Sequence, residues 1–107
     1  MIVRIWHGVT PATKADDYYE FLGRTGIPDY RGTEGNQGVM VLRRVDGSEA
    51  HFLLLSFWRS VEDIEKFAGA DVARARYYPE DRDYLLAFEE NAVHYELLNE
   101  EAFPGRS

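Results

Sequence analysis

The segment Leu53–Phe67 constrains the fold of this chain more than any other part of the sequence. Its first half, residues 53–58, is almost entirely apolar, which is typical of a strand that is buried on both faces. Ser60 follows shortly after, and its hydroxyl can accept a hydrogen bond from the backbone N–H near Asp63 at the start of a helix. The segment therefore predicts a buried strand that leads directly into a capped helix over residues 61–69.

The composition limits the classes of function. The 107 residues are 45% hydrophobic, which is enough for one globular domain with a core, and the net charge of −7 repels phosphate backbones and anionic membranes. We therefore expect neither a nucleic acid nor a membrane as partner. The chain has no cysteine, which excludes disulfides, thiolate catalysis and cysteine-ligated metals. The first residues lack the apolar stretch of a signal peptide and no segment is apolar enough to span a bilayer, so we expect a cytoplasmic protein.

Apolar spacing and turn residues predict the remaining elements. The first half is predicted to contain a strand over 2–9, a helix with Thr10 as its cap and Pro11 at its first position, and a glycine-rich loop over 23–38, with a short turn of helix at 28–31, that could form a mobile flap. Strands over 38–45 and 50–58 follow, joined by a hairpin at Asp46-Gly47-Ser48. The helix over 61–69, helical pieces over 71–78 and 80–90, and a strand over 91–98 complete the prediction. Residues 1–98 form one domain in this prediction, and residues 99–107 form a polar tail.

The order strand, helix, strand, strand, helix, strand is that of the ferredoxin-like split βαβ unit. It predicts an α+β fold in which both helices cover one face of a four-stranded antiparallel sheet. The strand over 50–58 is apolar on both sides, so the uncovered face would expose a large apolar patch unless a second copy packs on it. We expect a two-fold homodimer. The alternative is that the carboxy-terminal segment folds over the sheet.

Three segments carry a resemblance to a known family: the first strand running into Thr10-Pro11, the turn from Trp58 to Asp63, and His94-Tyr95-Glu96. Over residues 1–98 the chain resembles the antibiotic biosynthesis monooxygenase family of dimeric α/β barrels. The resemblance implies a dimer of two sheets with a pocket in each subunit between the helices and the sheet. It also implies either oxidation of a phenolic or quinol-type aromatic substrate by molecular oxygen without a bound cofactor, or haem degradation.

Haem degradation is disfavoured on the residues. The haem-degrading members use an asparagine on the first strand, a tryptophan on the second helix and a histidine that binds iron. The matching helical positions here are Phe67 and Tyr77, and no asparagine precedes Asn36.

Cofactor-free oxygenation requires a base, a hydrogen-bond donor and an aromatic pocket. His94 is the candidate base, because Glu96 lies on the same face of its strand and could orient the imidazole. Tyr77 and Tyr78 are candidate donors, and Arg76 is a candidate anion-binding group. Each of these has a structural alternative: a partly buried histidine, tyrosines of the core and a solvated ion pair.

Trp58, Phe67 and Trp6 are candidate pocket walls for a substrate, and the alternative is that they only fill the core. His7 shares a face of its strand with Val3 and Ile5 and could lie in the core or at the pocket rim, whereas His51 follows the hairpin and is expected in solvent. The three histidines have no metal-ligand spacing, so no metal site is predicted.

The leading hypothesis is a homodimeric barrel that binds a small, apolar or aromatic molecule and oxidises it with oxygen and no cofactor. A second hypothesis is a non-catalytic ligand-binding or stress-related barrel protein. A third is a haem binder with His94 or His7 as the iron ligand.

Overall fold

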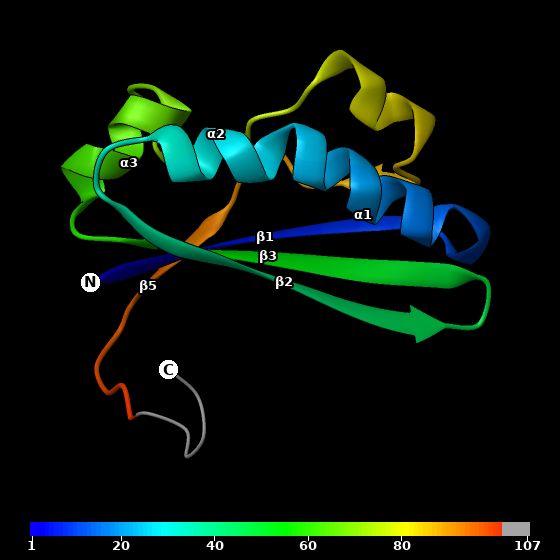
Figure 1. Cartoon of the computed structure of the whole chain (residues 1–107), viewed down its shortest axis with the longest axis horizontal. Helices are drawn as coiled ribbons and strands as arrows, with labels where there is room; N and C mark the ends of the chain where they lie inside the picture. Colours follow the sequence, from blue (N-terminus) through cyan, green and yellow to red (C-terminus); the bar gives the residue numbers. More distant parts are fainter. Residues whose placement is uncertain (102–107) are drawn as a thin grey trace.

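In the computed structural model, residues 1–101 form an antiparallel sheet covered on one face by helices (Figure 1). The strands are β1 (Ile2–Pro11), β2 (Asn36–Asp46), β3 (Glu49–Trp58), β4 (Ala87–Phe88) and β5 (Val93–Glu96); the α-helices are α1 (Ala15–Arg24), α2 (Gly26–Gly32) and α3 (Val61–Ala68); and the 3-10 helices are η1 (Ala12–Lys14) and η2 (Pro79–Asp83). Residues 102–107, the end of the predicted polar tail, lie outside the residues that the structure describes.

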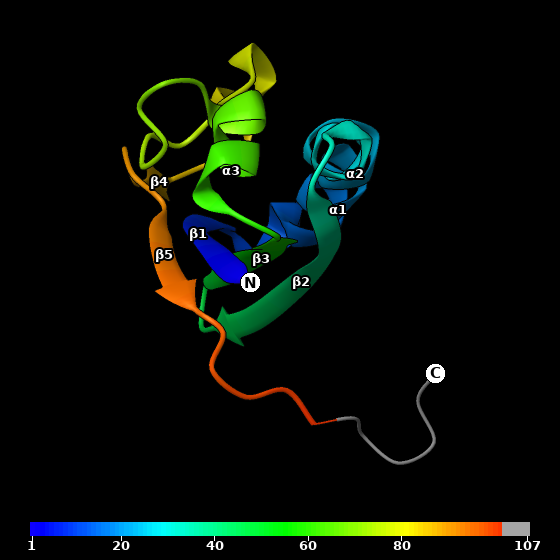
Figure 2. The same ribbon diagram turned by 90° about the vertical axis from the view of Figure 1, so that its left-hand side faces the viewer.

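The sheet has the order β2-β3-β1, and β4 and β5 both pair with the far edge of β1. The α+β, ferredoxin-like fold is thus confirmed, but the sheet has five strands instead of the predicted four, because β4 forms within the segment 80–90 that was predicted to be a helix. Figure 2 shows α1, α2 and α3 together on one side of the curved sheet. No helix among residues 1–101 is long and apolar enough to cross a membrane.

Residues 53–67 fold as the predicted buried strand and capped helix. Even-numbered residues of β3, such as Phe52 and Trp58, are fully buried against the helices, whereas Leu53 on the opposite face is 37% exposed. The Ser60 hydroxyl accepts a hydrogen bond from the Asp63 backbone N–H at 3.3 Å and caps α3. The sheet face away from the helices is therefore apolar and uncovered in the single chain.

Three predicted elements at the amino-terminal half differ in the structure. β1 continues through Thr10 to Pro11, and Thr10 does not cap a helix because its hydroxyl donates to the Pro11 carbonyl. Pro11 instead precedes η1. Most of the predicted loop over 23–38 is helical or extended, because only Thr25 separates α1 from α2 and because β2 begins at Asn36. The short helical turn predicted at 28–31 lies within α2.

The predicted helices over 71–78 and 80–90 are wrong. The first segment is irregular because its carbonyl groups bond outside it: those of Val72 and Arg74 accept from the side chain of Arg4, and that of Ala73 accepts from the Ala92 backbone N–H. The second contains only η2 and the two residues of β4, since the Leu86 backbone N–H donates to Val9 on β1. The final strand is correspondingly shorter than 91–98.

Candidate functional site

A cavity lies between the covered face of the sheet and the helices. It is lined from β1 and β3, from α1, α2 and α3, and from the segment after α3, by Arg4, Trp6, Tyr18, Leu22, Gly26, Tyr30, Leu54, Phe67, Ala75, Arg76, Tyr77, Tyr78 and Asp81. Its empty space is about 420 Å³ including the part open to solvent, but only about 30 Å³ can hold the centre of a water molecule. The walls must therefore move apart to admit a ligand larger than a few waters.

Six of the 13 residues that line the cavity are aromatic. The Tyr30 ring stacks on Phe67 with a centroid separation of 4.3 Å, and Trp6 meets Tyr77 edge-on at 6.0 Å. The Trp6 indole N–H also donates to the Tyr77 hydroxyl oxygen at 2.8 Å. Such a lining favours a flat, apolar ligand.

Arg4 is the most buried charged group of the cavity, with 1% of its surface exposed. It lies on β1 opposite Ser56, and alternation along the strand turns it to the helix side together with Trp6. Its guanidinium donates to the backbone carbonyls of Val72 and, at 2.8 Å, of Arg74. Arg4 therefore joins the sheet to the irregular segment after α3.

Among residues 1–101, Asp81 supplies the only carboxylate in the cavity lining, and it is 5% exposed. It accepts hydrogen bonds from the Tyr18 hydroxyl at 3.2 Å and from the Tyr78 backbone N–H at 2.6 Å. Burial raises the pKa of this carboxyl above its ordinary value of 3.8, against the opposing effect of these hydrogen bonds. A buried carboxylate with a raised pKa beside aromatic walls is suited to take a proton from a ligand.

The predicted tyrosine donors both line the cavity, but their own protons are already in use. The Tyr77 hydroxyl donates to the Glu89 backbone carbonyl, and the Tyr78 hydroxyl donates to the Asp29 carboxylate. Burial raises the pKa of both phenols, so both stay protonated at neutral pH. Phe67, Trp6 and Arg76, which were predicted to bind the substrate, also line the cavity.

His94 lies behind Arg4 and is not part of the cavity lining. Its Nε2 atom is 3.0 Å from Arg4 Nη1, and burial together with the Arg4 charge lowers the pKa of the imidazole below 6.5. His94 is therefore neutral at pH 7. No hydrogen bond joins it to Glu96 among the described residues, so its partner is Arg4 instead of the expected carboxylate.

Two further predicted residues lie away from the cavity. His7 is on the uncovered face of the sheet, where its Nε2 is 3.1 Å from His51 Nδ1 and its Nδ1 is 3.1 Å from Glu89 Oε1. Trp58 is fully buried behind Tyr30, and its indole N–H donates to the Ser56 hydroxyl at 2.9 Å. No group of three or more potential metal-binding side chains occurs within residues 1–101.

Sequence reasoning missed Arg4, Tyr30 and Asp81 as cavity residues. Arg4 has a visible signal, since it is a charged residue within the apolar strand Ile2–Val9 and shares its face with Trp6. Tyr30 lay in a short helical turn within a predicted loop, and Asp81 lay in a predicted helix among other acidic residues. The sequence positions of Tyr30 and Asp81 give no indication that both residues line the same cavity.

No protein-family model and no curated protein matches the sequence. Solved structures do match it over nearly the whole chain. The haem degrader MhuD from Mycobacterium tuberculosis, described with two haems in its active site, is 20% identical with a TM-score of 0.65, over 95% of this chain and 100% of that one. A proposed antibiotic biosynthesis monooxygenase from Nitrosomonas europaea is 18% identical with a TM-score of 0.65, over 92% and 100%.

A proposed antibiotic biosynthesis monooxygenase from Bacillus cereus is 14% identical with a TM-score of 0.68, over 95% of this chain and 97% of that one. At these identities the matches establish a common fold. The chain has the fold of antibiotic biosynthesis monooxygenase-type proteins, as the resemblance in its sequence implied.

Proposed function

We propose that this chain binds a small aromatic molecule of the phenol or quinol type in the cavity and oxidises it with molecular oxygen, without a bound cofactor. The observation that carries the proposal is a buried carboxylate, Asp81, within a cavity walled by aromatic rings. The fold supports it as well, because proteins of this fold include proposed monooxygenases. A fold alone does not define an activity, so the residues must be tested.

In the proposed reaction, Asp81 takes the proton of the substrate hydroxyl. The resulting phenolate is electron-rich enough to reduce oxygen. One oxygen atom becomes bonded to a ring carbon and the other leaves as water, so that a phenol and O₂ give a quinone and water. The substrate itself supplies the electrons. The aromatic walls exclude water from the reacting ring.

Asp81 replaces His94 as the proposed base because of position. Asp81 lines the cavity, whereas His94 lies behind Arg4 with Nε2 facing a guanidinium. A base must come within hydrogen-bond reach of the proton that it removes. In this proposal His94 orients Arg4.

A second candidate, haem degradation, is kept open by the fold shared with MhuD. The described residues of the cavity include no histidine, so the histidine-bound iron that the family resemblance implies has no counterpart in the lining. Absorption spectra with added haemin separate the candidates: a Soret band that shifts in His94→Ala or His7→Ala would favour haem binding.

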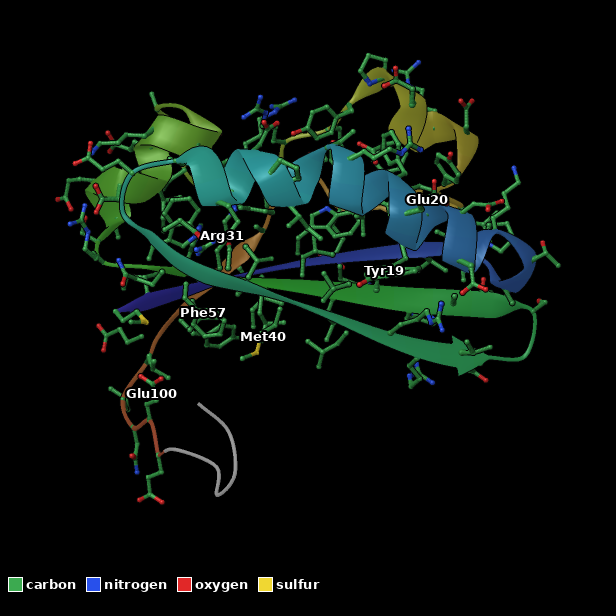
Figure 3. The ribbon with its side chains drawn as sticks, in the orientation of Figure 1. Tyr19, Glu20, Arg31, Met40, Phe57 and Glu100 are labelled. Carbon is green, nitrogen blue, oxygen red and sulfur yellow. The ribbon has the colours of Figure 1, made fainter. Side chains whose placement is uncertain are left out.

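We also propose that the chain forms a homodimer through the uncovered face of the sheet. Figure 3 shows Met40 and Phe57 pointing away from the helices. The exposed large apolar side chains of this face are Met40, Leu42, Leu53, Val93 and Tyr95. A second copy would remove this patch from water.

Oxygen uptake by the metal-free protein tests the oxygenase. The substrates are hydroquinones, anthrones and naphthols, and the autoxidation of each compound is subtracted. Asp81→Asn should lower kcat by about 10²–10⁴-fold, the usual contribution of a general base. Asp83→Asn is the matched control, since Asp83 is an exposed aspartate two residues away. Activity should rise with pH through a pKa above 3.8, because the base works only when ionised.

Three results would change the assignment. Full activity in Asp81→Asn would remove Asp81 as the base. If His94→Ala lost activity while Asp81→Asn kept full activity, His94 would again be the candidate base. Absence of uptake across the panel would favour the non-catalytic ligand-binding protein.

A further inference from the structure

The guanidinium of Arg4 is a buried cation without an anionic partner. Its polar neighbours are two backbone carbonyls, the neutral imidazole of His94 and the hydroxyl of Tyr30, none of which carries a negative charge. None of the ion pairs within residues 1–101 includes Arg4. Its Nε atom is the one buried side-chain nitrogen or oxygen in this part of the chain that has no hydrogen-bond partner. Burying an unpaired charge is costly, so this arrangement is unusual for a purely structural arginine.

A second arginine reaches the same cavity. Arg76 is partly exposed, and its guanidinium lies over the rings of Phe67 and Tyr78, at 5.2 and 5.6 Å from their centroids. Its only ion pair among the described residues is with Asp29, at 3.5 Å between Nη2 and Oδ2. The cavity lining therefore carries two arginines against a single carboxylate, that of Asp81, in a chain whose net charge is −7.

Both arginines act on the pKa of Tyr30. Tyr30 is buried in the cavity wall, and burial raises the pKa of its phenol while Arg4 and Arg76 both act to lower it. A tyrosine hydroxyl can donate one hydrogen bond to an anion but brings no charge of its own. Tyr30 thus leaves the positive charge of Arg4 without a counter-charge.

We infer that the cavity binds an aromatic substrate that carries a carboxylate, with this group held by Arg4 and Arg76 and with Tyr30 donating to it. The inference rests on the proposed function for its choice of site and deepens it by naming the substrate class, a hydroxylated aromatic acid. A guanidinium matches the two oxygens of a carboxylate in its donor geometry. The carboxylate would supply the missing counter-charge of Arg4, while the substrate hydroxyl would be directed to Asp81.

Binding without turnover tests the inference separately from the oxygenase. We would titrate 3-hydroxy-2-naphthoate and its methyl ester into the protein without oxygen, and follow heat release by calorimetry. The ester has the same ring and hydroxyl but no charge. We expect the acid to bind at least about tenfold more tightly than the ester, as a charge-assisted pair in a buried site would give.

Variants locate the effect. Arg76→Gln and Arg4→Lys should each reduce the acid-to-ester affinity ratio by about tenfold. Arg74→Gln is the matched control, because the Arg74 side chain is exposed and is not in the cavity lining. The affinity ratio is measured within each variant, so it stays informative if Arg4→Lys is less stable, and Arg76→Gln changes a residue that is already partly exposed.

Each outcome decides the matter. An acid preference that falls in Arg76→Gln or Arg4→Lys supports the carboxylate site, and it does so even if no oxygen is consumed, which would count against the oxygenase alone. Equal binding of acid and ester would overturn the inference. So would an acid preference that survives both substitutions, or a lack of binding by either compound.

Discussion

Gly8 on β1 lies beneath the indole of Trp6, and the substitution Gly8→Ala tests how strongly this contact fixes the cavity wall. A Cβ atom at position 8 would lie 2.7 Å from Trp6 Cζ2 and 3.0 Å from Cζ3. Both distances are shorter than normal carbon–carbon contacts, which are about 3.5–4.0 Å. The backbone conformation of Gly8 is one that alanine also adopts, so the loss of stability comes entirely from displacing the indole.

The expected loss follows from two contributions. Overpacking a buried site costs about 1–3 kcal/mol. Moving the indole also breaks the 2.8 Å hydrogen bond from Trp6 to the Tyr77 hydroxyl, which contributes about 1 kcal/mol. We therefore expect Gly8→Ala to lower the free energy of unfolding by about 2–4 kcal/mol, the sum of these contributions, and to weaken binding of aromatic ligands in the cavity.

Urea unfolding followed by far-UV circular dichroism measures this change. Gly23→Ala is the matched control: Gly23 lies in α1, and a Cβ atom there meets nothing within 4 Å. Alanine is the better helix former, so the control should gain about 0.5–1 kcal/mol. If Gly8→Ala were as stable as the wild type, the indole would not be held against Gly8 and the reasoning about this wall would be refuted.

Three further predictions follow from the described contacts. Ser60→Ala removes the cap of α3 and should cost about 1 kcal/mol in thermal or urea unfolding, whereas an unchanged stability would show that the 3.3 Å hydrogen bond contributes nothing. The folded state lowers the pKa of His94 below 6.5, so the protein loses stability as the pH falls below 6.5. The variant His94→Gln should lose less stability over that range, and identical stability-against-pH profiles of variant and wild type would contradict the environment assigned to His94. Leu53→Glu on the uncovered sheet face should give a monomer in sedimentation, with Val61→Glu on α3 as the control of similar exposure, and an unchanged dimer would place the interface elsewhere.

The candidate site was predictable only in part. Phe67, Trp6, Tyr77, Tyr78 and Arg76 were predicted in the pocket from residue type and spacing, and all line the cavity. His94 was predicted to share a face of its strand with Glu96, but the sequence does not reveal that its neighbour is the buried guanidinium of Arg4, which lines the cavity. Asp81 was not predicted because its burial depends on Tyr18, 63 positions earlier in the chain.

The sequence by itself determined the hairpin of β2 and β3 and the start of α3. Alternation along β3, the Asp46-Gly47 hairpin and the Ser60 cap are set by neighbours a few residues apart, so local patterns are sufficient to predict them. Only the tertiary structure decided the path of residues 71–90 and the chemistry of the cavity. Backbone groups of that segment bond to Arg4, to Val9 and to residues 90–92, and such distant partners override the local preference for helix.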